Sequence, residues 1–199
     1  MKKITAQIRN FFSSLTSVEE KESVPTMESL GVREKFKSLD PFIFLWKNCM
    51  KKMAVRTDVD ITFSRYFTFG SDMAYIRKFV GKPVYSMCNA EMNINILLYA
   101  VVIKGHNVNF ELHFHDRKLF CINYTYNYLT SRDRREILNS LEEKYHVSSA
   151  QLHNHIIVDK AGNGILVEEN ETLTINYLAP NSNVKYLTES YSGHSRIAM

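Results

Sequence analysis

Residues 94–126 decide the fold, and they read INILLYAVVIKGHNVNFELHFHDRKLFCINYTY. Two short turn-like segments, GHN at 105–107 and DRK at 116–118, divide this stretch into three parts. Residues 94–103 are almost continuously apolar, as in a strand at the centre of a sheet. The two later parts alternate apolar and polar side chains, which indicates strands with one face on the core. The stretch therefore predicts three sequential antiparallel strands.

The middle strand carries a polar row whose role has two interpretations. Alternate strand residues share a face about 6.5–7 Å apart, so Glu111, His113 and His115 lie together. One interpretation is an ordinary strand face that meets solvent or a partner. The other is a metal site, because two imidazoles and a carboxylate suit Zn²⁺. His153 and His155, in QLHNH, would complete that site if their segment were a neighbouring strand.

Helical patterns flank the strands, near residues 41–53, 72–80 and 132–145. Asp40-Pro41 is typical of a helix start, and Gly81 followed by Pro83 is typical of a helix end. Further strand-like segments continue to residue 178. Together these elements predict an α+β domain, with an antiparallel sheet of about five or six strands and helices packed on one face.

The ends of the chain differ from its middle. Residues 1–30 predict an appended amphipathic helix and a polar linker, since apolar residues recur on one helical face over 2–15 and TSVEEKESVPTMES follows. Residues 31–180 form the single α+β domain, and 181–199 are a polar C-terminal tail. Lys2, Lys3 and Arg9 give the first helix a basic side, so peripheral membrane contact through residues 2–15 is one option.

An aromatic row follows the histidines along the chain. Tyr124, Tyr126 and Tyr128 alternate with smaller polar residues on the third strand. Tyrosine is favoured at protein interfaces, because its ring buries apolar area while its hydroxyl keeps a partner. These three residues are therefore the candidate binding residues. Lys and Arg do not interleave with them, which argues against base stacking and against nucleic acid as a partner.

The segment around the second helix resembles a known module. Gly70-Ser71 before the helix and Val80-Gly81-Lys82-Pro83 after it are followed by strands. This pattern is similar to the helix–GKP–strand opening of SmpA/BamE outer-membrane lipoproteins and of β-lactamase-inhibitor-protein-like domains. The resemblance implies a short helix on an antiparallel sheet that binds other proteins. The chain lacks the lipobox cysteine of the first family and the paired cysteines of the second, so no functional residue is transferred.

Composition limits the other classes of function. The net charge is +4, far below that of a dense basic stripe for nucleic acid. The three cysteines, Cys49, Cys88 and Cys121, form no CxxC pair and predict free thiols in a reducing compartment. Residues 1–15 lack the apolar core of a secretory signal. We therefore expect a cytoplasmic protein.

The pattern of motifs favours binding over catalysis. GxSxG, GxxxxGK[ST] and GxGxxG do not occur. We expect a non-enzymatic protein-binding or regulatory module, acting on a protein partner or through self-association, without a cofactor. The alternative is a zinc-dependent enzyme that uses the polar row with both histidine pairs. A cysteine nucleophile, Cys88 or Cys121 paired with a histidine, is a further alternative, and the neighbour of Cys121 would be His113 or His115.

Overall fold

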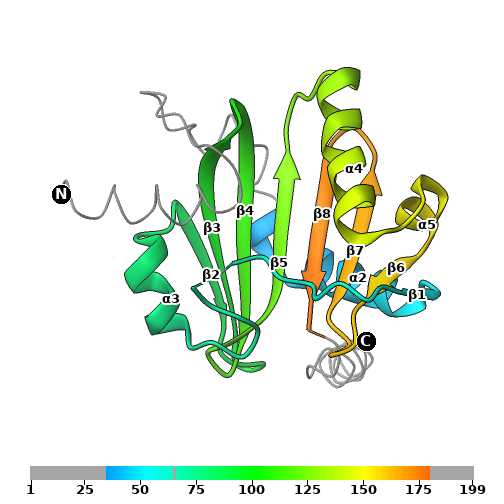
Figure 1. Cartoon of the computed structure of the whole chain (residues 1–199). Coiled ribbons are helices and arrows are strands. Elements are labelled where there is room, and N and C mark those ends of the chain that lie inside the picture. Colours follow the sequence, from blue (N-terminus) through cyan, green and yellow to red (C-terminus); the bar gives the residue numbers. More distant parts are fainter. Residues whose placement is uncertain (1–34, 65, 180–199) are drawn as a thin grey trace, which may run out of the picture.

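A sheet of eight strands organises the chain (Figure 1). The computed structural model describes residues 35–64 and 66–179. The strands are β1 (Ala54–Arg56), β2 (Tyr85–Asn89), β3 (Ile94–Ile103), β4 (His106–His115), β5 (Lys118–Tyr126), β6 (Ile156–Val158), β7 (Gly164–Glu169) and β8 (Leu173–Leu178). Their order across the sheet is β1-β6-β7-β8-β5-β4-β3-β2. β1 and β6 run parallel, and every other neighbouring pair is antiparallel.

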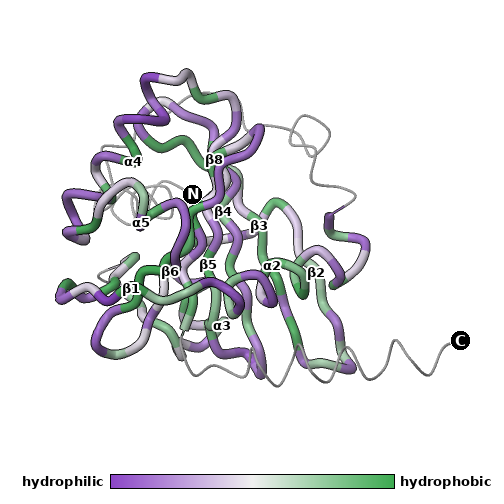
Figure 2. The backbone as a smooth tube through the Cα atoms, turned by 90° about the vertical axis from the view of Figure 1, so that its right-hand side faces the viewer, coloured by the Kyte–Doolittle hydropathy of each residue, from purple (hydrophilic) through white to green (hydrophobic). Residues whose placement is uncertain are grey.

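Helices cover both faces of this sheet. They are η1 (Lys35–Lys37), α2 (Asp40–Lys51), α3 (Met73–Val80), α4 (Ser131–Tyr145) and α5 (Ser149–Asn154). η1 and α2 pack on one face, here named the α2 face. α3, α4 and α5 pack on the opposite face, named the α4 face. The side view in Figure 2 places α2 on one side of the strands and α4 and α5 on the other.

The prediction of five or six antiparallel strands with helices on one face was wrong, although the α+β class agrees with the structure. The reason lies in β3, whose apolar run serves two cores. Ile94, Ile96 and Leu98 pack under α2, and Leu97, Tyr99 and Ile103 pack on the α4 face. A strand that is apolar on both sides must be covered on both sides.

The predicted meander of β3, β4 and β5 is present. Its two turns hold residues with positive φ, Lys104-Gly105 and Asp116-Arg117, as two-residue hairpins require. The register shifts after the His113–Cys121 pair, because Phe114 pairs with Leu119 and leaves Phe120 as an extra residue. Phe120 and Cys121 consequently both pack on the α2 face.

Local capping explains where the helices begin and end. Asp72, not Ser71, caps α3 by accepting from the Ala74 N–H, and Gly81 ends α3 at φ 87°. A reciprocal capping box of Thr130 and Asp133 starts α4. The predicted segments 1–30 and 181–199 lie outside the described residues. Within 35–64 and 66–179, no helix is long and apolar enough to cross a bilayer.

Candidate functional site

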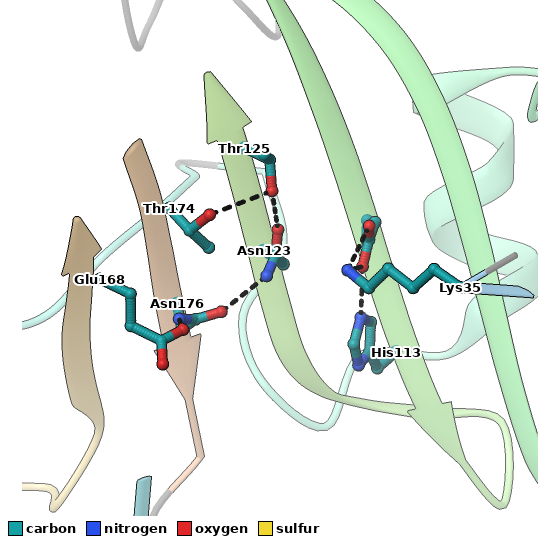
Figure 3. A network of polar contacts seen from close by, with 8 residues as sticks. Lys35, His113, Asn123, Thr125, Glu168, Thr174 and Asn176 are labelled. Atoms are coloured by element: carbon teal, nitrogen blue, oxygen red, sulfur yellow. Dashed lines mark hydrogen bonds and ion pairs between the residues drawn. The ribbon is translucent and has the colours of Figure 1, made fainter. Parts of the chain in front are cut away.

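A polar network occupies the α2 face next to the helix, across four neighbouring strands (Figure 3). Strand register creates it, because Glu111 pairs with Asn123 and Asn123 pairs with Asn176. Its members are Glu111, His113, Asn123, Thr125, Glu168, Thr174 and Asn176, with Lys35 reaching in from η1. The polar alternation predicted from sequence therefore exists. The expectation that Glu111 and His113 face solvent was wrong, since their side chains are 1% and 0% exposed.

Glu111 is the charged centre of this network. Burial by itself raises the pKa of the Glu111 carboxyl, but the Lys35 ammonium and the His113 hydrogen bond outweigh it and hold the pKa at about 2. Lys35 Nζ lies 2.8 Å from Oε1 and 2.9 Å from Oε2. Glu111 is therefore ionised, and both of its carboxylate oxygens are bound by Lys35 or His113.

His113 is the uncharged residue beside Glu111 in the polar network. Burial lowers the pKa of its imidazole. Its Nε2 lies 3.3 Å from Glu111 Oε2, so the neutral ring donates that Nε2–H to the carboxylate. The rings of Phe42, Trp46 and Phe120 enclose it edge to face, with centroids 5.3 Å, 5.8 Å and 6.2 Å away. His113 therefore acts as a packed core residue that orients Glu111.

The amide end of the network ties three strands together. Asn123 Nδ2 donates to Asn176 Oδ1 at 2.7 Å, and Asn176 Nδ2 donates to Glu168 Oε2 at 3.1 Å. Thr125 Oγ1 donates to Asn123 Oδ1 at 2.9 Å. These bonds run from β5 through β8 to β7. They satisfy the buried amides and fix the registration of the strands.

The thiols beside this network are in their inert form. Cys121 lies directly opposite His113 in the β4–β5 register. Burial raises the pKa of the Cys121 thiol well above its ordinary value and that of Cys49 to about 12. The nucleophile in cysteine chemistry is the thiolate. The pair of Cys121 and His113 therefore does not form an activated nucleophile.

The two histidine pairs do not meet. QLHNH is helical: His153 lies in α5 and His155 follows its last residue. α5 packs through Leu152 on the α4 face, whereas His113 packs on the α2 face. His153 Nδ1 lies 3.2 Å from Glu169, and His115 Nε2 lies 3.6 Å from Asp116. The condition for the five-residue zinc site is not met, and the described ranges hold no group of three or more potential ligands placed for a metal ion.

A cleft of about 700 Å³ lies on the α4 face, between α4 and the sheet. Tyr124, Tyr126 and Tyr177 line it from β5 and β8, and Asp133, Glu136 and Glu143 line it from α4. Tyr124 is 5% exposed, and its hydroxyl has no hydrogen-bond partner among the residues that the structure describes. The structure therefore brings two of the three predicted tyrosines to one cavity. Tyr128 is outside it and 88% exposed.

The outer side of α2, with the two residues that follow it, carries both apolar and basic side chains and is here named the α2 surface. It comprises Phe44, Met50 and Met53 with Lys47, Lys51 and Lys52. Seven large hydrophobic side chains are exposed in the described part of the chain, and three of them are in this group. Phe44, Lys47 and Lys51 follow i, i+3, i+7 spacing, which places them on one helical face. Residues 35–53 contain five lysines and one aspartate, a net charge of +4.

Sequence reasoning missed Lys35, Glu168 and Asn176. Asn176 and Thr174 do leave a signal, since they alternate with apolar residues in LTINYL. Lys35 leaves none, because its partner Glu111 lies 76 positions away.

No protein-family model, curated protein or solved structure matches this chain. The resemblance of residues 70–83 to the helix–GKP–strand module therefore stays a prediction. The polar network, the cleft and the α2 surface are the features of the described residues that bear on function.

Proposed function

We propose that this chain is a non-enzymatic protein-binding module that docks an acidic, partly apolar surface of another protein through the α2 surface. The observation that carries the proposal is that Phe44 and Met50 on α2, and Met53 just after its end, are exposed within ten residues of chain that also hold three lysines. Phe44 is 68% exposed and Met53 is 72% exposed. Exposed apolar groups that cluster within a polar rim mark interaction sites.

The chemistry of the α2 surface suits an acidic partner. The Phe44 ring offers a rigid anchor, and the two thioether side chains adapt their shape to a partner. The lysines supply the positive field that guides an acidic surface and speeds its association. α2 is held from behind by Phe42 and Trp46, which are fully buried, so the helix presents these groups on a fixed backbone.

The interior of the protein supports a role without catalysis. Glu111 is bound by Lys35 and His113, and the amides of Asn123 and Asn176 are bound by each other. The buried thiols stay protonated. A regulatory role through the bound partner is part of the same proposal, and so is the cytoplasm as its compartment. The cysteines are free thiols in the structure, as a reducing environment maintains them.

The test uses the full chain as bait in a lysate of its source cells, at low and high salt. Captured proteins are identified by mass spectrometry, and each is then purified and titrated against the chain by calorimetry. We expect an acidic protein whose affinity falls with salt. Phe44→Ser with Lys51→Glu lowers that affinity about tenfold or more, as loss of an interface anchor does.

The matched control is Tyr75→Ser with Lys160→Glu, which also removes an exposed aromatic ring and reverses a lysine. This control should bind like the wild type. The proposal fails if both double variants bind equally well, or if no purified candidate binds the wild-type chain.

A further inference from the structure

The cleft on the α4 face is independent of the α2 surface, because it opens on the other side of the sheet. Its volume of about 700 Å³ falls within the range of small-molecule sites, roughly 300–1,000 Å³. The walls have the usual composition of such sites, with aromatic and aliphatic side chains and a few polar groups. The aliphatic part comes from Ile103, Ile137, Leu141 and Ile175.

The tyrosine wall points to a planar ligand. Tyr124, Tyr126 and Tyr177 present aromatic surface from adjacent strands, and the Tyr124 and Tyr177 rings meet edge to face at 5.8 Å. Burial raises the pKa of Tyr126 to about 12 and that of Tyr124 well above its ordinary value. Both phenols are therefore neutral at physiological pH. Neutral rings of this kind attract the faces and edges of other aromatic groups.

The Tyr124 hydroxyl adds a requirement for a hydrogen-bonding group on the ligand. It is buried and has no hydrogen-bond partner in the described chain. Buried hydroxyl groups in proteins nearly always have a partner. Seven buried side-chain polar atoms of the described residues have none, and the Tyr124 hydroxyl is related to a ligand because Tyr124 lines the cleft. A ring N–H of a ligand would donate to the Tyr124 oxygen.

The charges around the cleft favour a cation. Three carboxylates line it, from Asp133, Glu136 and Glu143, against the ammonium groups of Lys104 and Lys144. Asp133 is used by the Thr130 cap, and Glu136 pairs with Arg132. Lys144 donates to the Thr62 carbonyl and covers the Tyr145 ring. Neither Glu143 nor Lys104 has a partner among the described residues, so the preference for a cation rests on the excess of one carboxylate over the ammonium groups in the lining, with Glu143 as the open carboxylate.

We propose that this cleft binds a small aromatic amine, with its ring against Tyr126, a ring N–H on the Tyr124 hydroxyl and its ammonium group near Glu143. A cation beside neutral tyrosine faces gains further attraction from the rings. An aromatic acid would instead bring a fourth negative charge to the three carboxylates.

Three indoles of similar shape test the proposal on the full chain: tryptamine, indole and indole-3-propionate. Binding is measured by calorimetry and by ligand-observed NMR. Tryptamine should bind about fivefold more tightly than indole, the order of effect of one partly exposed ion pair. Indole-3-propionate should bind most weakly. Equal binding of the three, preference for the acid, or no binding of any overturns the proposal.

Two substitutions locate the contacts. Glu143→Gln should remove the preference for tryptamine and leave indole unchanged. Glu142→Gln is the matched control, because it makes the same change one residue away and outside the cleft lining. Tyr124→Phe should weaken all three ligands while keeping the ring in place. Equal effects of Glu142→Gln and Glu143→Gln contradict the assignment, and thermal melting confirms that each variant is folded.

Discussion

On the α2 face the buried amides of Asn123 and Asn176 have partners, whereas on the α4 face the buried hydroxyl of Tyr124 has none. Both groups belong to one sheet, and Asn123 and Tyr124 are adjacent in β5. The first arrangement stabilises the protein and fixes strand register, because these two amides are matched to each other and to Glu168. The second lowers stability unless something else supplies the partner. The comparison separates polar groups that hold the structure from polar groups that are available for binding.

The largest expected effect concerns Glu111. Its folded pKa of about 2 lies below its ordinary value of 4.5, so its contribution is complete above pH 4.5 and is lost as the pH falls toward 2. A difference of this size corresponds to about 3 kcal/mol. The unfolding free energy is to be measured by urea titration between pH 7 and pH 2, for the wild type and Glu111→Gln. The gap between the two proteins should shrink by about that amount.

Exposed Glu136→Gln serves as the control for this titration, since its side chain is 62% exposed. The difference in unfolding free energy between the wild type and Glu136→Gln should not shrink comparably as the pH falls. A constant gap between the wild type and Glu111→Gln across the acid range means that Lys35 and His113 do not stabilise the ionised carboxylate.

The next largest expected effect is the loss of unfolding free energy when the Asn123–Asn176 amide pair is disrupted. Asn123→Leu leaves Asn176 Oδ1 without its donor and Thr125 without its acceptor, so we expect a loss of about 2 kcal/mol. Asn123→Leu with Asn176→Leu should cost less than the two single changes added together, because no buried amide is then left unmatched. Urea unfolding of the four proteins gives this double-mutant cycle. Additive losses show that the two amides are not coupled.

The smallest effect, and one of opposite sign, is expected at Tyr124. Tyr124→Phe removes a buried hydroxyl that has no partner, so the unfolding free energy of the ligand-free protein should stay constant or rise by up to about 1 kcal/mol. Tyr99→Phe is the matched control, since the Tyr99 hydroxyl donates to the Gly81 carbonyl at 3.3 Å. That control should lose stability. A larger loss of unfolding free energy for Tyr124→Phe than for Tyr99→Phe would show that the Tyr124 hydroxyl does have a stabilising partner.

The elements that sequence predicts well depend on local chemistry. The hairpins of β3, β4 and β5 follow from alternation and turn residues, and the end of α3 follows from Gly81. The helical state of QLHNH also has a local signal that was overlooked. Ser148 and Gln151, the first residue of QLHNH, form a capping box, and this pattern predicts a helix start.

The features that escaped prediction depend on distant partners. Alternation identifies the polar side of β4, but burial of Glu111 comes from Lys35, and burial of His113 comes from Phe42 and Trp46 in α2. The pairing of β1 with β6 joins segments of only three residues, too short for a periodic signal. The cleft requires the relative placement of α4 and β5, which no local pattern specifies.

The parallel β1–β6 pair bears on the order in which the chain assembles. It joins position 54 to position 156, a separation of 102 residues, whereas β3, β4 and β5 are joined by tight turns. Closing a long loop costs more entropy than closing a short one, so contacts between distant positions form slowly. During synthesis α2 precedes the strands that it covers, and its core is completed only when Leu166 and Leu178 have emerged. β1 must wait for residues 156–158, and the β1–β6 edge joins the rest of the sheet only through β7 and β8, which emerge later still.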